Sequence, residues 1–288
     1  MPIYQIALLA IVQGLAELLP VSSSAHVIAV AKLVGIDPTS PQFTLLLVML
    51  HTGTMFAVIL YFWKAWKRVF FSTREQTMQF LRVIVIATIV TGVIGLGLKK
   101  GIEHVIKHSH NGIGKAEIEE LFNHLELISA ALAAAGVLIL IAGIRSMGKA
   151  ARENITDKDA LLIGAVQGLS LPFRGFSRSG STISAGLLCG VAKMRLEEYS
   201  FALAVVLTPP VVLYEAYRLV KSRHDTFGLP LGVHDFLPSL IGMVFSFAAG
   251  LFALRLLSRL LEGGKWWIFG IYCLLAAGGM FVMYSYGY

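Results

Sequence analysis

Six apolar stretches of this chain are each long enough to cross a lipid bilayer, and they restrict the fold more than any other feature. A spanning helix needs about 20 apolar residues because the hydrocarbon core is about 30 Å thick. The chain is 56% hydrophobic and 14% charged, whereas soluble domains carry about 25% charged residues. We therefore expect an all-α polytopic membrane protein. The predicted transmembrane helices are residues 42–63, 78–98, 124–145, 197–219, 235–257 and 266–286.

Two further apolar regions are interrupted by polar residues. Residues 3–19 lead into ELLPVSSSAH, and only a short apolar stretch follows at 25–36. Residues 159–173 lead into RGFSRSG, and again a short stretch follows at 181–192. Apolar stretches of about 10–14 residues are typical of re-entrant segments. We expect two re-entrant helix–loop–helix hairpins, whose irregular turns must be surrounded by protein or water.

The two hairpins resemble each other. AIVQGLAELLPVSSSA aligns with GAVQGLSLPFRGFSRS without gaps, at an offset of 154 residues, and FTLLLVMLHTG echoes FALAVVLTPPV at an offset of 158. We predict one integral-membrane domain, 1–288, made of two repeats, 1–145 and 150–288. Three predicted spans separate the hairpins, and an odd number of crossings turns the second repeat over. The pattern therefore predicts an inverted-topology repeat.

The basic residues predict the orientation. If residues 64–77 are cytoplasmic, fourteen Lys and Arg lie on the inner side and eight on the outer side, which places both termini outside. The four tryptophans, Trp63, Trp66, Trp266 and Trp267, are then expected in an aromatic belt at the cytoplasmic interface. Residues 99–123 are expected to form an outer loop. The net charge of +7 is interpreted as loop charge facing membrane lipids, and no nucleic-acid partner is expected.

The hairpin turns carry charges that are costly in a membrane. Each charge at a helix centre costs at least about 2.5–3.5 kcal/mol, so Glu17, Arg174 and Arg178 together cost on the order of 8–10 kcal/mol by that scale. Such groups persist only where they neutralise one another, line water or bind a charged ligand. On the predicted topology the two turns enter from opposite sides and meet near the middle of the bilayer.

The residue types in the two turns suit phosphoryl transfer. Arg178 and the backbone N–H groups of Ser179–Thr182, at the start of a helix, predict an anion site, and an arginine fork matches phosphate oxygens. The first turn supplies Glu17 as acid, base or metal ligand, serines as nucleophile or hydrogen-bond donors, and His26 for proton transfer. Spacing alone does not choose between Ser22 and Ser23 as nucleophile.

The segments QGLAELLPVSSSAH and GFSRSGST resemble the two signature motifs of the undecaprenyl-pyrophosphate phosphatase, or bacitracin-resistance, family, roughly (E/Q)GxxExxPVSSTGH and PGxSRSGxT. The resemblance extends over nearly the whole chain. It implies hydrolysis of the C55 lipid diphosphate to the monophosphate and inorganic phosphate, which recycles the carrier lipid for peptidoglycan synthesis and gives bacitracin resistance. It also implies a divalent cation, Mg²⁺ or alternatively Ca²⁺, and a bacterial plasma membrane with the active site opening to the outer face.

The resemblance implies functional positions at Gln13, Glu17, Ser22, Ser23, His26, Ser177, Arg178, Ser179 and Thr182. From these positions and the chemistry of the two turns we predict the following roles. The catalytic residues are Glu17, Ser23, His26 and Arg178. The predicted substrate-binding residues are Gln13, Ser22, Ser24, Ser177, Ser179 and Thr182. Glu17, with Gln13, is predicted to bind the metal.

Three positions depart from the family pattern. Ser24 replaces a threonine and keeps the hydroxyl. Ala25 replaces a glycine, so a left-handed turn there is unfavourable. Arg174 replaces a proline, which puts the geometry of the second turn, and the preference for the lipid head group, in doubt.

Other interpretations stay open. Inverted repeats are common in transporters, so a flippase or transporter for the carrier lipid or another anion is the alternative function, and a non-catalytic scaffold is a third. Glu17 and Arg178 could instead form a structural ion pair. His51, inside the predicted span 42–63, could edge the site or serve packing. A homodimer is a further expectation.

Overall fold

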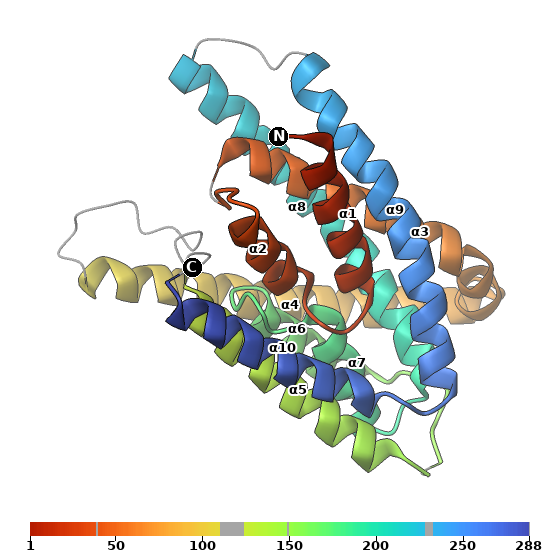
Figure 1. The fold of residues 1–288 in the computed structure, drawn as a ribbon. Coiled ribbons are helices and arrows are strands. Elements are labelled where there is room, and N and C mark those ends of the chain that lie inside the picture. The colour runs from red at the N-terminus through yellow and green to blue at the C-terminus, as the bar shows by residue number, and fades with distance from the viewer. Residues whose placement is uncertain (39, 110–123, 149, 228–232, 288) are drawn as a thin grey trace.

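The computed structural model describes residues 1–288 except 39, 110–123, 149, 228–232 and 288. Within the described residues the chain forms ten helices, arranged as Figure 1 shows. Their bounds are α1 Ile3–Leu18, α2 Ser23–Leu33, α3 Pro41–Val69, α4 Arg74–Ser109, α5 Leu125–Ser146, α6 Asp157–Ser170, α7 Arg178–Leu188, α8 Lys193–Phe227, α9 Val233–Glu262 and α10 Trp267–Ser285.

Six of the helices, α3, α4, α5, α8, α9 and α10, are long and apolar enough to cross a membrane. This confirms the predicted all-α polytopic fold. One boundary was wrong: the outer loop expected from residue 99 is helical as far as Ser109, in α4. Lys99 and Glu103 are four residues apart on this helix and form an ion pair at 3.9 Å, a spacing that supports a helix. The rest of that predicted loop, 110–123, lies outside the described residues.

The two interrupted regions form two pairs of short helices. α1 and α2 are joined by residues 19–22, and α6 and α7 by residues 171–177. In each pair the two helices pack against each other. The helix–turn–helix form predicted for these segments is therefore present, while their re-entrant insertion into a bilayer stays a prediction.

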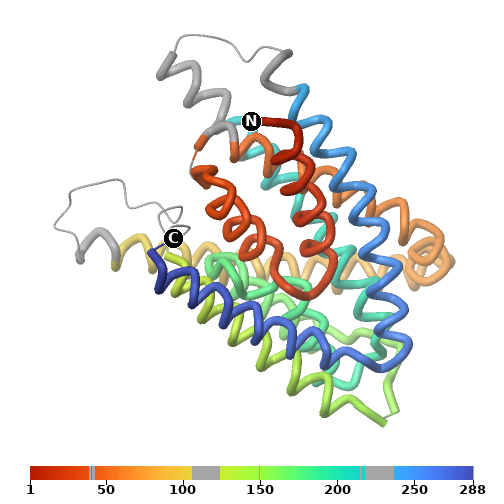
Figure 2. The backbone as a smooth tube through the Cα atoms, in the orientation of Figure 1, coloured from red at the N-terminus to blue at the C-terminus, as the bar shows by residue number. Residues whose placement is uncertain are grey.

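The helices of the two halves interleave. α1 packs along α9 and α6 along α4, while α5 packs along α10 and α3 along α8; Figure 2 lets the reader follow the α1–α9 and α5–α10 pairs. Close contact is possible because glycines lie at the crossings. A Cβ on Gly14 would be 2.6 Å from Ala249 Cβ, and one on Gly168 would be 2.9 Å from Ile94 Cβ. The first helix of each predicted repeat thus packs on the fourth helix of the other.

The predicted aromatic belt is only partly present. Trp63 is 51% exposed, but Trp66 and Trp266 are buried. Their indole N–H groups donate to the Glu198 carbonyl oxygen at 3.0 Å and to Ser184 Oγ at 3.1 Å. Both side chains are core residues, because a buried indole packs its apolar body inside once its single donor has a partner.

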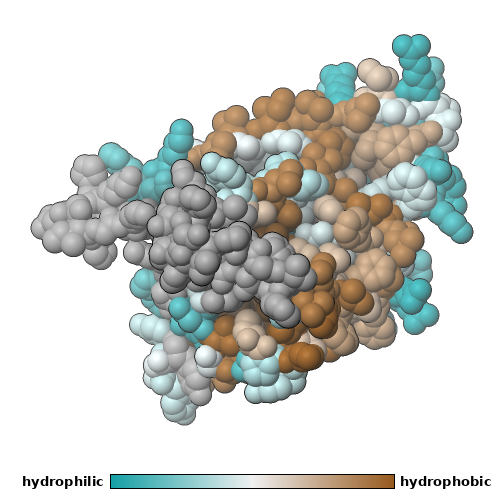
Figure 3. All heavy atoms as spheres, turned by 90° about the horizontal axis from the view of Figure 1, so that it is seen from above, coloured by the Kyte–Doolittle hydropathy of each residue, from teal (hydrophilic) through white to brown (hydrophobic). Residues whose placement is uncertain are grey.

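Much of the surface is apolar, as lipid contact requires. Exposed large apolar side chains occur along all six membrane-spanning helices, among them Leu60, Ile89, Val137, Leu213, Phe252 and Leu275. In Figure 3 hydrophobic residues cover a broad area of the described part of one face, with the most hydrophilic residues gathered toward its edges.

Candidate active site

The first polar turn follows directly from the sequence around Pro20. α1 ends at Leu18, and Leu19 is extended (φ −81°, ψ 150°), the conformation preferred before proline. Ser22 then has φ 68°, and it is the one non-glycine residue with positive φ in the described part of the chain. Positive φ costs a β-carbon-bearing residue on the order of 1 kcal/mol. The left-handed position is therefore Ser22, and not residue 25, because Ala25 lies inside α2.

The second polar turn depends on Gly175. Its φ is 102°, and a Cβ there would lie 2.3 Å from the Ile128 carbonyl oxygen, so no other residue fits without movement. Arg174, in place of the family proline, is compatible with this turn. Ser177 precedes α7, and its Oγ accepts a hydrogen bond from Gly180 N at 3.2 Å. This cap fixes the start of the helix at Arg178.

The two turns meet at a salt bridge. Arg178 Nη2 donates to Glu17 Oε1 at 2.6 Å, although the residues are 161 positions apart. Their side chains are 21% and 14% exposed, respectively. Ser179 Oγ also donates to the Leu19 carbonyl oxygen at 3.5 Å. The predicted meeting of the two polar turns is therefore present in the fold.

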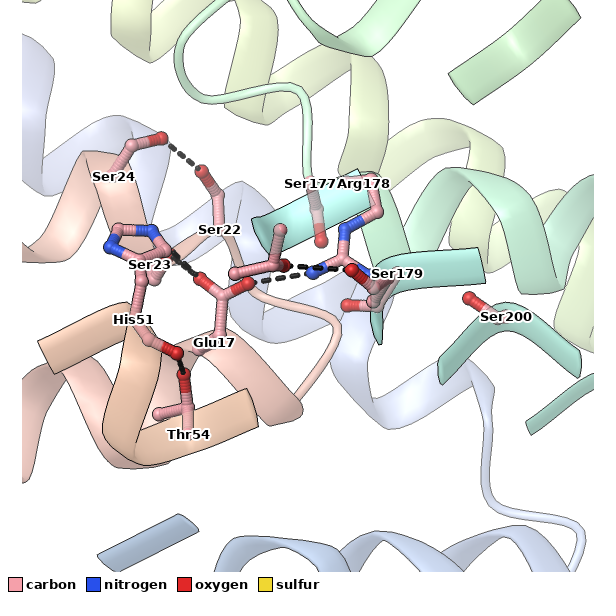
Figure 4. A network of polar contacts seen from close by, with 12 residues as sticks. Glu17, Ser22, Ser23, Ser24, His51, Thr54, Ser177, Arg178, Ser179 and Ser200 are labelled. Carbon is pink, nitrogen blue, oxygen red and sulfur yellow. Dashed lines mark hydrogen bonds and ion pairs between the residues drawn. The ribbon is translucent and has the colours of Figure 1, made fainter. Parts of the chain in front are cut away.

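Glu17 is the centre of the cluster, with partners on both sides (Figure 4). Ser23 Oγ donates to Glu17 Oε2 at 2.5 Å, and Gln13 Nε2 donates to the same oxygen at 3.1 Å. His51 Nε2 lies 3.6 Å from this oxygen, which is too far for a hydrogen bond. Arg178 approaches the other carboxylate oxygen. The carboxylate thus links a serine hydroxyl to a guanidinium.

Two buried polar atoms of this cluster have no hydrogen-bond partner. One is Arg178 Nη1, a donor, and the other is Gln13 Oε1, an acceptor. Gln13 is fully buried. An unpaired buried polar group costs about 1–3 kcal/mol, and such groups in native proteins commonly indicate a function or a bound ligand. The donor suits an anion and the acceptor suits a cation or a water molecule.

Of the other predicted residues in the first turn, Ser22 and Ser24 form a pair. Their hydroxyl oxygens are 3.3 Å apart. His26 Nδ1 lies 2.8 Å from the Ser22 carbonyl oxygen and Nε2 lies 2.8 Å from Tyr272 Oη. Since a carbonyl only accepts, Nδ1 carries the proton, and Nε2 of the neutral ring accepts from the tyrosine. His26 therefore contacts Tyr272, and neither Ser23 nor Glu17 is among its hydrogen-bond partners.

In the second turn, the backbone and hydroxyl groups are largely engaged within α7. Gly180 N and Ser181 N both donate to Ser177. Thr182 Oγ1 donates to the Arg178 carbonyl oxygen at 2.8 Å and lies 2.7 Å from Ser200 Oγ. Thr182 is 1% exposed. Among the side chains that the sequence assigned to anion binding, the Arg178 guanidinium has a buried donor without a partner, Nη1.

Sequence reasoning gave too little weight to two residues. His51 was left open between the site and packing, and it lies beside Glu17. Tyr272, in the last helix, was not singled out, although its ring stacks on His26 at 5.6 Å between ring centres. A signal existed for His51, since an ionisable residue inside a spanning helix is by default a candidate for function. Tyr272 carried none, because tyrosines are ordinary residues near membrane interfaces.

Fold and site together define a class of protein: a polytopic membrane protein in which two polar turns build a buried serine–carboxylate–arginine centre. A family model described as bacitracin resistance protein BacA matches residues 6–279. The chain therefore belongs to this family.

Curated relatives match along the whole chain. Undecaprenyl-diphosphatase 2 of Acinetobacter baylyi is 52% identical over 281 residues, which is 96% of each chain. Undecaprenyl-diphosphatase 1 of Burkholderia pseudomallei is 33% identical and covers 98% of this chain and 96% of its own. Undecaprenyl-diphosphatase 2 of Burkholderia ambifaria is 32% identical, with 96% and 95% covered.

Proposed function

We propose that this chain is a membrane phosphatase that hydrolyses undecaprenyl diphosphate to undecaprenyl phosphate and inorganic phosphate. The reaction recycles the carrier lipid for cell-wall synthesis, and the family's name associates it with bacitracin resistance. The relatives named undecaprenyl-diphosphatase support this activity along the full chain. The structural observation that carries the proposal is Glu17, which is bonded to both Ser23 and Arg178 where the two turns meet.

Arg178 holds the terminal phosphate in this proposal. Its Nη1 is a buried donor without a partner, and phosphate oxygens are strong acceptors for a guanidinium fork. Binding a phosphate there satisfies that donor while Nη2 keeps its bond to Glu17. Stabilising the charge of the transferred phosphoryl group is the main requirement of this chemistry.

Ser23 is the proposed nucleophile and Glu17 its base. The 2.5 Å hydrogen bond from Ser23 Oγ to Glu17 Oε2 is the nucleophile–base contact that activation of a serine needs. Ser23 Oγ attacks the terminal phosphorus, its proton passes to Glu17, and the bond from phosphorus to the bridging oxygen breaks. The lipid monophosphate leaves with that oxygen. Water then cleaves the phosphoserine and releases inorganic phosphate; a water in place of Ser23 is the one-step alternative.

His26 acts at the periphery of this centre. With Nδ1 held by the Ser22 carbonyl group, Nε2 is the atom that exchanges protons, and Tyr272 is its partner. We place its proton transfer on the leaving-group side, because Ser23 already has a base in Glu17. Ser22, Ser24, Ser177, Ser179 and Thr182 line or brace the two turns around the substrate head group.

A divalent cation, Mg²⁺ or alternatively Ca²⁺, belongs to the proposal. In the described residues no three His, Cys, Asp or Glu side chains come together as a metal site. Mg²⁺ commonly uses only one or two carboxylates plus substrate phosphates, so Glu17 with the unpartnered Gln13 Oε1 fits such an ion. When bound, the cation would neutralise phosphate charge.

The proposed setting is a bacterial plasma membrane, with the site opening to the outer face and both termini outside. The charge bias of the loops supports this orientation. The partners are the polyprenyl diphosphate and membrane lipids, and a homodimer stays a prediction.

The test is phosphate release from undecaprenyl diphosphate by the purified full chain in detergent, with and without a chelator. Arg178→Ala is expected to lower kcat/KM by about a hundred- to a thousandfold, the usual loss when one oriented charge-stabilising donor is removed. Arg145→Ala, an exposed arginine at the end of α5, is the matched control and stays within about twofold of the wild-type rate.

The detergent format also separates hydrolysis from transport, since it has no second compartment. Release of phosphate by wild type and its loss in Arg178→Ala support the phosphatase. Wild-type protein that binds the lipid and releases no phosphate, with or without added Mg²⁺ or Ca²⁺, contradicts it and favours the flippase alternative. Near-normal turnover in Arg178→Ala contradicts the assigned role of that residue.

A further inference from the structure

His51 faces Glu17 from the middle of α3 and has no place in the reaction described so far. Its Nδ1 lies 2.8 Å from the Leu47 carbonyl oxygen. Since that oxygen only accepts, Nδ1 carries the proton, and Nε2 of the neutral ring presents a bare lone pair. Nε2 points at Glu17 Oε2, 3.6 Å away. In the neutral form of the ring, two electron-rich atoms therefore face each other without a hydrogen bond between them.

Gln13 adds a third electron-rich atom beside them. Its amide touches the same carboxylate oxygen through Nε2 at 3.1 Å, and its Oε1 is buried without a partner. A half-turn of the amide about its last side-chain bond exchanges these two atoms and presents the unpartnered oxygen to the same point. After this turn, the Ser23 hydroxyl is the remaining side-chain donor to Glu17 Oε2, and the acceptor atoms of Gln13, Glu17 and His51 converge in the way that binds a cation.

The geometry fits ligation by one ion. Two ligands about 2.1 Å from a first-row divalent ion lie about 3.0 Å apart at a right angle and about 3.4 Å apart at a tetrahedral angle, close to the 3.6 Å between Nε2 and Oε2. A ligating histidine almost always donates its other ring N–H to a carbonyl or carboxylate, which orients the ring. The bond from Nδ1 to Leu47 does this for His51.

We infer that His51 Nε2 is a ligand of the divalent cation at this site, together with Glu17 and Gln13. The inference rests on the proposed function only for the need of a cation, and it adds a nitrogen ligand from α3. An imidazole nitrogen suits first-row transition ions such as Fe, Ni, Cu and Zn, whereas Ca²⁺ prefers oxygen ligands. Mn²⁺ binds such sites most weakly of the first-row series and serves here as a paramagnetic probe; with one nitrogen ligand, the site is expected to bind Mn²⁺ more tightly than Ca²⁺.

The test measures metal binding directly, on the full chain in detergent without substrate. One equivalent of Mn²⁺ is added, and pulsed electron paramagnetic resonance records the coupling of the ion to imidazole ¹⁴N. Wild type is expected to show this coupling. His51→Gln, which replaces nitrogen by an amide oxygen, is expected to lose it and to bind Mn²⁺ at least about tenfold more weakly. Its affinity for Ca²⁺ is expected to change by less than about threefold, because Ca²⁺ accepts the oxygen.

His124→Gln is the matched control, because His124 is exposed and pairs with Glu126 away from the site. It retains the ¹⁴N coupling. Absence of the coupling in wild type, or equal Mn²⁺ affinity in wild type and His51→Gln, overturns the inference and leaves His51 without a role in metal binding. If His51→Gln does not fold, His26→Gln labelled with ¹⁵N-histidine provides the second test: a ¹⁵N signal retained in this variant cannot come from His26 and supports His51, whereas its loss overturns the inference.

The experiments distinguish failure of the ligand assignment from failure of the proposed function. Phosphate release by a protein without nitrogen coupling overturns the ligand and leaves the phosphatase. Nitrogen coupling in a protein that releases no phosphate from undecaprenyl diphosphate supports the ligand and contradicts the phosphatase.

Discussion

Glu17 lies in the last turn of α1, just before Pro20 ends the helix, and this position lets it reach both halves of the chain. One carboxylate oxygen accepts from Arg178 of the second half, and the other accepts from Ser23 of its own turn. An ion pair that served structure alone would not need the serine. The combination of a nucleophile, a base and a cationic anchor is what favours catalysis over the structural interpretation.

The choice between Ser22 and Ser23 gives the first prediction. Ser23→Ala is expected to lower kcat by at least about a thousandfold, as loss of a nucleophile does elsewhere, because its hydroxyl is the one bonded to Glu17. Ser22→Ala is expected to cost less than about tenfold, since Ser22 Oγ pairs only with Ser24. Phosphate release by both variants is the measurement. Equal losses in the two variants, or a tolerant Ser23→Ala, would favour direct attack by water.

Tyr272 is predicted to act through His26. Tyr272→Phe keeps the stacked ring and removes the hydroxyl that donates to Nε2. We expect kcat to fall about tenfold, and the pH profile of kcat to shift, because the phenol no longer holds the neutral form of the imidazole. Tyr284→Phe, on the same helix, is the control. An unchanged pH profile in Tyr272→Phe would show that the pair only packs.

Some residues of the site were predictable from their place in the sequence. Glu17, Ser23 and Arg178 each lie in a polar turn between apolar stretches, where a charged or polar side chain is costly in a membrane and therefore indicates a function. His51 and Tyr272 come from α3 and α10, and only the packing of those helices brings them to the turns. The unpaired state of Gln13 Oε1 was likewise invisible, because sequence does not reveal which buried atoms lack partners.

At the scale of the elements, close crossing of helices sets the position of the site. Gly14 lies one residue after Gln13, and a Cβ on it would lie 2.6 Å from Ala249 Cβ and 2.6 Å from the Ser246 carbonyl oxygen. Backbone atoms of α9 yield little, so α1 would have to move away. Because α1 carries both Gln13 and Glu17, its displacement alters the site as well as the packing.

Gly14→Ala is therefore predicted to destabilise the protein by about 1–3 kcal/mol, the usual cost of overpacking, and to lower kcat. Thermal unfolding in detergent and phosphate release measure the two effects. Gly97→Ala is the matched control: a Cβ on Gly97 in α4 meets nothing within 4 Å, and alanine favours the helix by about 0.8–1.0 kcal/mol over glycine. A lower melting temperature in Gly97→Ala than in Gly14→Ala would contradict this account.

The start of α6 depends on a network around Asp159. Its carboxylate accepts from Arg152 at 2.6 and 2.7 Å and from Thr156 N at 2.7 Å. Burial alone would raise the pKa of Asp159, but the hydrogen bonds from Arg152 and Thr156 outweigh it and leave the pKa below its ordinary value. Charged Asp159 thus stabilises the fold, because the folded chain binds this proton less readily than the unfolded chain.

Asp159→Asn is predicted to cost about 1–3 kcal/mol at neutral pH, since it removes a buried charge partner of hydrogen-bonded groups. The stability that the carboxylate provides is fully present above the unfolded pKa, about 3.9, and is lost as pH falls through the lower folded pKa. The difference from wild type should therefore shrink below about pH 4. Unfolding at several pH values tests this, with Asp157→Asn, a more exposed carboxylate beside Arg82, as the control that changes stability little.

Hydropathy predicted the existence of the six spanning helices, and their ends were less predictable. α4 continues through Lys99 and Lys100 because lysine is a good helix former, so polarity marked the end of the apolar stretch and not the end of the helix. Trp66 and Trp266 were misplaced for a related reason. Composition places tryptophan at an interface, but only packing shows that its N–H finds a buried acceptor.

For the whole molecule, the helices of the two predicted repeats interleave, and their inverted topology stays a prediction. α1 packs on α9 and α6 packs on α4, in addition to their contacts with α2 and α7 of their own halves, so the first helix of each half also packs against the other half. The Glu17–Arg178 contact then lies where the halves join. Two unequal turns, one carrying the carboxylate and serine and the other the guanidinium, form one centre only when both halves fold together.

An inverted repeat fixes the sides on which the connections lie, and this is the last prediction. In a variant lacking Cys189 and Cys273, single cysteines are placed at Ser72, between α3 and α4, and at Tyr286, after α10. Both positions are exposed. The second hairpin is predicted to enter from the cytoplasm, and three helices, α8 to α10, follow it, so residue 286 is expected outside and residue 72 inside. An impermeant thiol reagent applied to intact cells is therefore expected to label Tyr286→Cys and not Ser72→Cys.

Permeabilised cells provide the control, because both cysteines should then react. Labelling of Ser72→Cys alone in intact cells would invert the orientation and place the carboxyl terminus in the cytoplasm. Labelling of both would mean that an even number of crossings separates them, which is incompatible with two re-entrant hairpins among six spans. Since the predicted topology brings Glu17 to Arg178 through hairpins that enter from opposite sides of the bilayer, that result would require a different account of how the site reaches its lipid substrate.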